Sequence, residues 1–442
     1  MNIAPRYSRP DTLGAATHAS PIRNRRHFVD DDIWVRYDVE VSGDGGGESS
    51  ARRDADAATD ASLLFEKAGP RELLFFEPGT VKAAIVTCGG LAPGLNNVIR
   101  SLVTELHFHY GTRTILGIPN GYRGLNPAEK LTPIELTPDM VDNIHTEGGT
   151  ILGTSRGMQD QYVMLEYLKA LGVNLLFCIG GDGTLRAAAK IAAAAAERSE
   201  KIAVIGVPKT IDNDVYYCDR TFGYSTAVDA ARDVLTVAHV EAKGAERGLG
   251  LVKLMGRDAG FIACGATVSS QQVNYTLIPE VPFQLDGPRG LLAELERRMD
   301  ARKHALIAVA EGAGQDLFPP EERGTDASGN TRYGDIGHLL RDRIAQYFRD
   351  IGKPVDMKYI NPSYTIRGVP ANSEDSLLCD RLARDAVHAA MAGKTSCQVS
   401  FLNNRVVHVP LSLAVGRTKQ VDVDGPLWQA VLASTGQPVF RD

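Results

Sequence analysis

The sequence predicts an α/β protein built of two Rossmann-like lobes with mostly parallel sheets. Three observations predict this class. Short apolar runs of strand length end in glycine-rich or polar loops, segments with helical spacing of apolar residues follow those loops, and this strand–loop–helix unit recurs along the chain. Such a series pairs its strands in parallel, with helices on the faces of the sheet, and binds ligands at the carboxyl ends of the strands.

Composition narrows the class of function. The chain has 442 residues, of which 43% are hydrophobic and 23% charged, as in ordinary globular proteins. Its formal charge of -6 argues against nonspecific nucleic-acid binding, which requires a basic surface. No apolar stretch approaches the roughly 18 residues of a membrane span, and no apolar signal-peptide core follows the basic run 23–26. We expect a cytoplasmic protein that binds neither nucleic acid nor membranes.

The six cysteines are widely scattered and form no Cys-x-x-Cys pair. Most of them stand beside apolar or small residues. This pattern favours reduced thiols in a core over disulfides or zinc ligands, and it agrees with a reducing compartment.

Residues 1–79 are expected to form an N-terminal arm. Apolar and polar residues alternate between 33 and 41, which predicts one strand, whereas residues 42–62 are rich in glycine, serine, alanine and charges without periodicity, which predicts a flexible linker. No residue of the arm carries a catalytic signal. We expect the arm to pack on a neighbouring subunit or to stay mobile.

The first lobe is expected to comprise residues 80–223 together with 367–415. Three predicted strands each lead into a loop with glycine or acidic residues, and these strands are 81–86, 175–179 and 203–207. Because the carboxyl ends of parallel strands share one edge of a sheet, the three loops should converge. An amphipathic helix around residues 377–387 would return the chain to this lobe.

The second lobe is expected to comprise residues 224–366 together with 416–442. A further series of apolar strands begins here, and its members are 250–255, 277–281 and 305–310. The second lobe therefore repeats the parallel architecture of the first.

Two loops of the first lobe have the composition of phosphate sites. The turn Gly89–Gly94 follows a strand and opens a helix, so its backbone N–H groups can approach a phosphate, although a purely structural turn is an equal alternative. The loop Gly180–Thr184 places Asp182 at a strand end, where its carboxylate can reach a hydrated Mg²⁺ that bridges phosphates. A helix-capping role for Asp182 is the alternative.

The segment Thr210–Asp214 is the most specific feature of the sequence. Asp212 and Asp214 stand at alternating positions, and in an extended segment they would point the same way. One carboxylate could then act as a base toward a substrate hydroxyl, while the other orients it or holds a metal. A surface turn rich in Asp and Asn is the alternative, but the position directly after an apolar strand argues against it.

The run Gly393–Thr395 imitates the end of a P-loop. The residue five positions before Gly393 is His388, and the run follows a helix rather than a strand. We therefore expect a helix C-terminus there and no phosphate cradle.

In combination and in this order, these motifs resemble the 6-phosphofructokinase family across residues 80–415. The resemblance rests on the turn at Gly89, the Gly180–Thr184 and Pro208–Asp214 loops, and four further segments: Gly148–Thr150 with Arg156, Met255–Arg257, Glu311–Gly312 and Lys358–Arg367. Thr87–Gly90 and Tyr359–Tyr364 look most like the ATP-using enzymes of plants and trypanosomatids, a branch related to the pyrophosphate-using enzymes.

The resemblance implies the phosphofructokinase fold, with the active site between its lobes, and a reaction. The γ-phosphoryl group of ATP would pass to O1 of fructose 6-phosphate with Mg²⁺ present. Asp212 matches the base that takes the O1 proton, Asp214 and Thr210 match residues that assist it, and Arg257 completes the implied catalytic group.

The resemblance also implies the two binding sites. The nucleotide and its phosphates would contact a set of first-lobe residues, with Asp182 at the metal: Gly90, Arg156, Gly181, Asp182, Gly183, Thr184 and Lys209. The sugar phosphate would contact Thr210, Asp212, Met255, Gly256, Arg257, Glu311, Lys358, Tyr364 and Arg367. Lys358 matches a residue that reaches a neighbouring subunit's substrate, so a homo-oligomer, a dimer or a tetramer, is implied.

Two positions bear on the phosphoryl donor. The pyrophosphate-using enzymes carry Asp where this chain has Gly183, and that carboxylate fills the space of the α-phosphate, so Gly183 favours ATP. Lys209 is shared with the pyrophosphate enzymes, and the plant-like branch combines both features and uses ATP. A pyrophosphate-dependent enzyme is the main alternative.

Two other classes remain as remote alternatives. NAD and diacylglycerol kinases share the Gly-Gly-Asp-Gly-Thr loop but lack the sugar-phosphate half. A non-catalytic regulatory paralogue would be expected to lose Asp182 or Asp212, and both are present.

Overall fold

The computed structural model describes residues 6–23, 27–39, 62–319 and 333–440. The linker predicted at 42–62 thus lies almost entirely outside the described residues. The chain divides into two compact units. Unit 1 comprises Met1–Thr210, Val215–Gly223 and Pro370–Arg417, and unit 2 comprises Ile211–Asp214, Tyr224–Val369 and Thr418–Asp442. The chain therefore passes between the units after Thr210, Asp214, Gly223, Val369 and Arg417.

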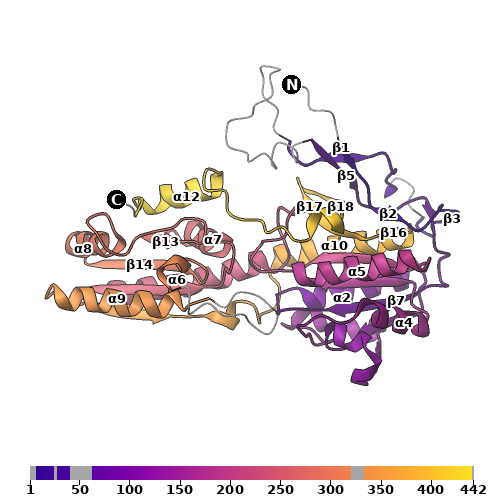
Figure 1. Ribbon diagram of the computed structural model, residues 1–442, viewed down its shortest axis with the longest axis horizontal. Coiled ribbons are helices and arrows are strands. Elements are labelled where there is room, and N and C mark those ends of the chain that lie inside the picture. Colours follow the sequence, from indigo (N-terminus) through magenta and orange to yellow (C-terminus); the bar gives the residue numbers. More distant parts are fainter. Residues whose placement is uncertain (1–5, 24–26, 40–61, 320–332, 441–442) are drawn as a thin grey trace, which may run out of the picture. The chain divides into compact units, whose positions relative to one another are not determined.

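Unit 1 is built on a ten-stranded sheet (Figure 1). Its parallel centre has the order β17-β11-β10-β7-β8, with bounds Cys397–Leu402, Ala203–Pro208, Leu175–Gly180, Lys82–Thr87 and Thr114–Ile118. Antiparallel strands extend both edges: β18 (Arg405–Pro410) pairs with β17, and β9 (Ile134–Glu135) with β8. The three strands predicted for the first lobe are β7, β10 and β11.

Helices cover both faces of this sheet because neighbouring residues of a strand point to opposite sides. Ile85 packs in one core with α2 (Leu95–Thr104) and α10 (Ser373–Met391). Val86 packs in the other with α4 (Gln161–Leu171) and α5 (Asp182–Glu197). The predicted α/β class is confirmed, and the helix expected near 377–387 is the middle of α10.

The described part of the N-terminal arm packs on unit 1 of its own chain, and its expected contact with a neighbouring subunit stays a prediction. β5 (Leu63–Lys67) joins the large sheet and pairs with β1 (Arg6–Ser8) and β4 (Trp34–Arg36). Two small sheets add β2 (Asp11–Thr12) on β16 (Lys394–Thr395) and β3 (His18–Ala19) on β6 (Leu73–Leu74). Strand pairing therefore joins the arm to the rest of unit 1 at two places, β5 on β18 and β2 on β16.

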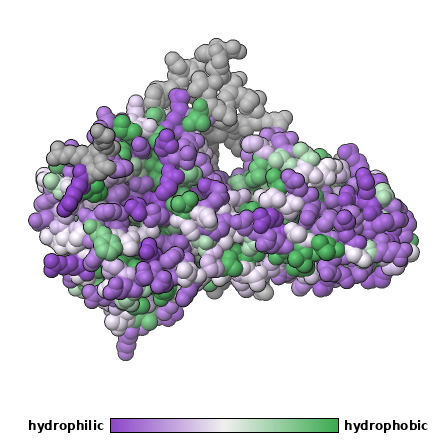
Figure 2. Space-filling model, turned by 180° about the vertical axis from the view of Figure 1, so that it is seen from behind, coloured by the Kyte–Doolittle hydropathy of each residue, from purple (hydrophilic) through white to green (hydrophobic). Residues whose placement is uncertain are grey.

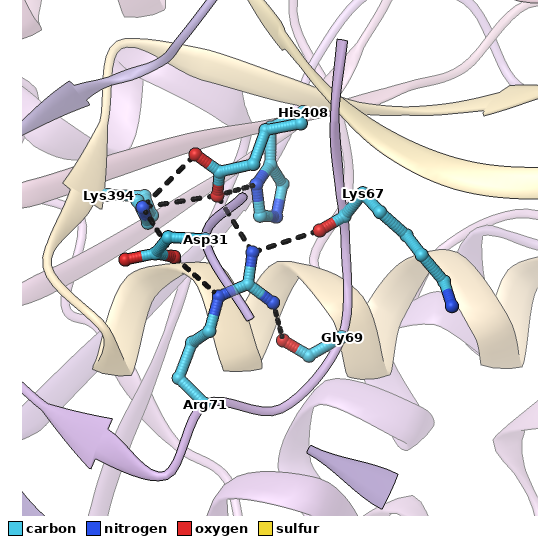
Figure 3. Close-up of polar contacts among 7 residues, drawn as sticks. Asp31, Lys67, Gly69, Arg71, Lys394 and His408 are labelled. Carbon is cyan, nitrogen blue, oxygen red and sulfur yellow. Dashed lines mark hydrogen bonds and ion pairs between the residues drawn. The ribbon is translucent and has the colours of Figure 1, made fainter. Parts of the chain in front are cut away.

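A cluster of charged side chains, the arm cluster, connects the arm with β16 and β18 (Figure 3). Arg71 donates to Glu66 Oε1 at 2.8 Å and to Asp31 Oδ1 at 2.7 Å. Lys394 Nζ lies 3.1 Å from Glu66 and 3.0 Å from Asp31, and His408 Nδ1 lies 3.1 Å from Glu66 Oε1. All except Asp31 are buried. The cluster ties Asp31, Glu66 and Arg71 of the arm to β16 and β18, which carry Lys394 and His408.

Opposite charges stabilise the ionised form of Glu66. Burial alone would raise the pKa of Glu66, but the hydrogen bond from His408 and the charges of Lys394 and Arg71 outweigh it and lower that pKa to about 2. Burial also lowers the pKa of His408, so its imidazole is neutral near pH 7 and contributes a hydrogen bond, whereas Arg71 and Lys394 supply the positive charge.

The P-loop look-alike ends a helix, as expected. α10 stops at Met391, and Gly393 has a φ of 75°, the left-handed conformation that glycine adopts most readily. Lys394 then enters the arm cluster. Its ammonium group is occupied by carboxylates and does not serve a phosphate.

Unit 2 carries a four-stranded parallel sheet of order β13-β14-β12-β15, with bounds Tyr275–Leu277, His304–Ala310, Gly248–Leu254 and Asp356–Ile360. One core packs its strands against α8 (Leu291–Arg302) and α9 (Ile336–Asp350). Against the sheet also lie α6 (Tyr224–Gly244) and α7 (Phe261–Ser270), with α12 (Pro426–Thr435) on α7. The second parallel lobe is thereby observed.

The surface and the cysteines fit a globular protein. Hydrophilic side chains cover most of the described surface on the face in Figure 2, with apolar patches between them. All six cysteines are buried and none forms a disulfide. Within the described ranges, no helix has the length and apolar character needed to cross a bilayer.

Candidate active site

Three loops of unit 1 emerge at one edge of its sheet. β10 lies between β7 and β11, and the register pairs Ile179 with Thr87 and Gly180 with Pro208, so the three strands end within one residue of each other. The Gly89–Gly94 turn, the Gly180–Thr184 loop and the Pro208–Asp214 loop therefore begin side by side. The predicted convergence of the three loops is confirmed.

Lys209 links two of these loops. Its ammonium group donates to the Gly90 carbonyl at 2.6 Å, and its side chain is buried. A Cβ placed on Gly181 would lie 3.4 Å from the Lys209 carbonyl, so the third loop also approaches closely. A cation is thus held at the centre of the loop edge.

The glycines of the first turn are required by its shape. Gly89 and Gly94 have φ values of 84° and 99°, and a Cβ on Gly94 would lie 2.5 Å from the Cys379 sulfur. The Gly89 N–H donates to the Ser155 carbonyl at 3.0 Å. The next residue, Arg156, therefore has its backbone beside the glycine turn, and its side chain is exposed.

Asp182 is the first residue of α5, where the helix dipole favours negative charge. Its Oδ1 accepts the N–H of Gly416 at 2.9 Å, and its Oδ2 pairs with Arg186 one turn along the helix. Asp182 therefore lies in the first turn of α5, after the N-cap residue Gly181, and its role as a metal ligand stays a prediction. Thr184 beside it is buried, and Tyr122 donates to its carbonyl at 2.8 Å.

The donor set at this edge fits Mg²⁺. In the described part of the chain, no group of three or more His, Cys, Asp or Glu side chains forms a cage for a metal. Mg²⁺ usually needs only one or two carboxylates, because phosphate oxygens and waters complete its octahedron. A single carboxylate at a helix N-terminus, as at Asp182, suits such an ion.

The segment around Asp212 departs from the predicted extended conformation. Asn213 has a φ of 56°, in the left-handed region that Asn tolerates better than most residues, so a regular strand is interrupted between the two acids. The expectation that the alternation of a strand aligns Asp212 and Asp214 is wrong. The two carboxylates nevertheless interact, because Asp214 raises the pKa of Asp212.

The pKa of Asp212 is raised into the range near neutral pH. Burial raises the pKa of Asp212 first, the charges of Asp214, Glu311 and Asp258 raise it further, and Arg367 partly opposes them, which gives a value of about 8. A general base works best with a pKa near the working pH. All these neighbours belong to unit 2.

Two loops at the carboxyl edge of the unit 2 sheet carry the predicted sugar-phosphate residues. Met255 and Gly256 follow β12, and Glu311 follows β14; the Glu311 N–H donates to the Leu254 carbonyl at 2.9 Å. Gly256 has a φ of 132°, and a Cβ on it would lie 2.7 Å from the Ala259 carbonyl. A side chain at this glycine would strain the turn, so the loop is fixed.

Arginines approach these carboxylates. Burial raises the pKa of Glu311, and the charges of Lys253, Arg257 and Arg367 oppose that effect. Arg367 follows the short 3₁₀ helix Ser363–Ile366, and its guanidinium group lies 4.6 Å from the ring centroid of Tyr364. The structure thus brings Arg257, Glu311 and Arg367 into one electrostatic neighbourhood with Asp212.

Lys358 lies on β15, beside β12, and its Nζ lies 3.0 Å from Asp356. The structure places it on the same sheet as β12 and β14, the strands that lead to Met255 and Glu311. Its implied contact with another subunit remains a prediction.

Sequence reasoning missed two residues of this neighbourhood. Asp258 raises the pKa of Asp212 and accepts a hydrogen bond from the Tyr333 hydroxyl at 2.6 Å. Arg257 lies 5.0 Å from the ring centroid of Tyr333. The acid directly after the Met-Gly-Arg motif was a detectable signal for Asp258, whereas Tyr333 stands 75 residues further on and has none.

Comparison with curated proteins gives long matches. The chain is 52% identical over 380 residues to the ATP-dependent 6-phosphofructokinase of Amycolatopsis methanolica, covering 85% of this chain and 83% of the relative. It is 44% identical over 441 residues to the enzyme of that name in Borreliella burgdorferi, covering 97% and 96%. A chloroplastic ATP-dependent 6-phosphofructokinase of Arabidopsis thaliana is 46% identical, covering 85% and 69%.

Solved structures agree with the fold. A pyrophosphate-dependent phosphofructokinase from Marinobacter aquaeolei superposes with a TM-score of 0.67 at 18% identity, covering 82% of this chain and 92% of that one. Phosphofructokinase from Pichia pastoris superposes with a TM-score of 0.63 at 23% identity, covering 82% of this chain and 38% of that one. The family model described as Phosphofructokinase matches residues 82–390. The two parallel sheets, their loops and these matches together show that the chain belongs to the phosphofructokinase family.

Proposed function

We propose that this chain is an ATP-dependent 6-phosphofructokinase, which makes fructose 1,6-bisphosphate from fructose 6-phosphate in glycolysis. The function predicted from the sequence agrees with the names of the curated relatives at 44–52% identity. The single structural observation that carries the proposal is Asp212, a carboxylate whose pKa is raised to about 8 beside Glu311 and Arg367. Such a group can deprotonate a sugar hydroxyl near neutral pH.

Unit 1 supplies the donor side of the reaction. The backbone N–H groups of the Gly90 turn and of Gly181, Gly183 and Thr184 at the start of α5 would bind phosphate oxygens, as helix N-termini do. Arg156 and Lys209 add positive charge. Asp182 would hold Mg²⁺, which when bound neutralises charge on the transferring phosphates.

Unit 2 supplies the acceptor side and the base. Arg367 and Tyr364 would bind the 6-phosphate, where a guanidinium group can donate two parallel hydrogen bonds, while Met255, Gly256 and Glu311 would orient the sugar. Asp212 accepts the O1 proton as O1 bonds to the γ-phosphorus. The bond from that phosphorus to the β–γ bridging oxygen breaks, and ADP leaves.

Three further residues support the transfer. The negative charge of Asp214 raises the pKa of Asp212. Thr210 stands two residues before Asp212 and would contact the acceptor with its hydroxyl group. Arg257, whose charge already acts on Glu311, would stabilise the negative charge that develops on the transferred group.

The donor assignment depends on Gly183. Gly183 is exposed, and a Cβ placed on it would meet nothing within 4 Å, so the backbone leaves room for an α-phosphate. Pyrophosphate is the second candidate donor, because Lys209 already stands at the loop edge where the pyrophosphate enzymes carry lysine.

We further propose a homo-oligomer, a dimer or a tetramer, in which Lys358 serves a neighbouring subunit's substrate. The buried, unoxidised cysteines support a reducing compartment and agree with a cytoplasmic location.

A coupled assay of fructose 1,6-bisphosphate formation tests the function. Purified protein would be given fructose 6-phosphate and Mg²⁺ with either ATP or pyrophosphate, and ATP should give the higher kcat/KM. Preference for pyrophosphate would overturn the donor assignment. Phosphorylation of NAD or diacylglycerol instead of the sugar phosphate would overturn the acceptor, and no turnover with any donor would indicate a non-catalytic paralogue.

A further inference from the structure

The segment Gly416–Val421, the strap, is the last passage of the chain from unit 1 to unit 2. It follows the short helix Leu411–Ala414, and the boundary between the units falls after Arg417. None of its residues belongs to the motifs that resemble the family. Its contacts nevertheless reach the predicted metal ligand, Asp182, and two places in residues 212–217, the base segment, which carries Asp212.

In unit 1, Arg417 binds the two consecutive tyrosines at the end of the base segment. Its guanidinium carbon lies 3.8 Å from the ring centroid of Tyr216 and 5.4 Å from that of Tyr217. Nη2 donates to the Tyr216 hydroxyl at 2.8 Å, and Nη1 donates to the Tyr217 hydroxyl at 2.7 Å. One side chain therefore fixes both rings through stacking and through hydrogen bonds.

In unit 2, the strap contacts the base segment itself. The Lys419 N–H donates to the Asp214 carbonyl at 2.8 Å. The Gln420 amide donates to the Asp258 carbonyl at 3.1 Å, and the Val421 N–H donates to Glu280 at 2.8 Å. Two of these three acceptors, Asp214 and Asp258, are residues whose charges raise the pKa of Asp212.

The base segment needs such support because its backbone is strained. Asn213 and Tyr217 have φ values of 56° and 54°, and Tyr217 has a bulky, fully buried side chain. Non-glycine residues keep this conformation only where their surroundings over-determine it. Arg417 holds Tyr217 on one side, and the N–H of Lys419, two residues later, holds Asp214 on the other.

We propose that Arg417 is a positioning residue for phosphoryl transfer, which fixes the segment 212–217 and thereby the carboxylate of Asp212. This inference rests on the proposed function. It predicts a specific kinetic effect: misplacing a base by a fraction of an ångström lowers the rate of the chemical step, while the phosphates and the sugar still bind to the other residues of the proposed sites.

The main test is Arg417→Met, which keeps the length of the side chain but removes its charge and its five donors. We expect kcat to fall 10- to 100-fold and KM for each substrate to change less than about threefold, as for a group needed mainly in the transition state. The lower limb of the pH–kcat profile should also shift, because Asp214 and Asp258 move relative to Asp212. Arg417→Lys keeps the positive charge but loses the planar guanidinium group that donates to both hydroxyls, and should retain only part of kcat.

A matched control is Arg381→Met. Arg381 also stacks on an aromatic ring of unit 1, with its guanidinium carbon 5.0 Å from the centroid of Phe401, and it lies outside the loop edge. This variant should keep wild-type kcat. If Arg417→Met fails to fold, Tyr216→Phe and Tyr217→Phe each remove one hydroxyl acceptor and should lower kcat in the same direction.

The outcomes separate two failures. Wild-type protein that does not phosphorylate fructose 6-phosphate would overturn the proposed function. An active wild type with unchanged kcat and pH profile in Arg417→Met would overturn only the positioning role. Equal rises in both KM values at constant kcat would likewise overturn it, because they would indicate a general loss of binding.

Discussion

The ammonium group of Lys209 is bound to the carbonyl of Gly90 at 2.6 Å, so a cation from the end of β11 is built into the glycine turn after β7. The charge is therefore fixed in place before any donor arrives. Both ATP and pyrophosphate would meet it, which means that Lys209 cannot choose between them. Selection must come from the space around the phosphates, and Gly183 controls that space.

Gly183→Asp should abolish the use of ATP. The new side chain has room and needs no unusual backbone, since a Cβ at this position would meet no atom within 4 Å, so folding should be unaffected. A carboxylate a few ångströms from a polyanion costs on the order of 4 kcal/mol at an effective dielectric near 20, roughly a thousandfold in kcat/KM. Gly183→Asn, with the same shape and no charge, is the control. Equal losses in both variants would show that bulk, not charge, excludes ATP.

Asp212→Asn should lower kcat by about 10² or more, because a positioned base typically contributes 10² to 10⁴. The fold should survive, since the amide has the shape of the carboxyl group and removes a charge that the site destabilises. Steady-state kinetics and thermal unfolding of the purified variant provide the measurement. Near-normal turnover would remove Asp212 from the role of base.

Activity should depend on pH through the same carboxyl group. With a pKa of about 8, Asp212 is mostly protonated below that pH, so kcat/KM should fall as the pH is lowered through this range. Asp214→Asn removes a negative charge that raises this pKa, so the fall in kcat/KM should occur at lower pH in this variant. If kcat/KM falls at the same pH in both proteins, another group controls it.

Arg367→Ala should raise KM for fructose 6-phosphate far more than KM for ATP. Loss of a hydrogen-bonded charge on a phosphate costs ~2 to 3 kcal/mol, roughly a 30- to 150-fold change. Initial rates with each substrate varied in turn will show the difference. Comparable effects on both substrates would identify a structural arginine, a role that its stacking on Tyr364 would also allow.

The arm cluster should make stability depend on acid pH. The pKa of Glu66 is lowered to about 2 from an ordinary 4.5, so its contribution is complete above pH 4.5 and is lost as the pH falls from there toward 2. Glu66→Gln should cost about 3 to 5 kcal/mol at pH 7, because Arg71 and Lys394 lose their buried partner. The difference in free energy of unfolding between this variant and the wild type, measured with urea, should be smaller at pH 3. Glu72→Gln, at an exposed position, is the control, and a cost equal to that of Glu66→Gln would show that burial of the pair is irrelevant.

The sequence predicted the central strands well because each is a continuous apolar run followed by a loop with a chemical signature. The strand expected at 203–207 is β11, Ala203–Pro208, and its loop carries Asp212 as expected. The arm was harder, because β2 and β3 have only two residues each and depend on partners far away in the chain. β17 and β18 also escaped prediction.

The electrostatics of the site could not be predicted for a related reason. The partners of Asp182 include the N–H of Gly416, 234 residues away, and backbone groups leave no trace in the sequence. Glu66 stands in an apolar strand without any local sign that Lys394 and His408 will meet it. The motifs predicted which residue types the site contains, but not the hydrogen-bond and ion-pair partners that shift the pKa values of those residues.

The repeated passage of the chain between the units has a consequence for its biosynthesis. On the ribosome, β11 emerges long before β17, its parallel neighbour, and all of residues 224–369 come out in between. A nascent chain thus carries an unpaired strand edge while the whole of α6 to α9 is being made, and such edges invite association with other chains. Premature termination before Arg417 would leave both units incomplete, so neither half can be expected to mature on its own during translation.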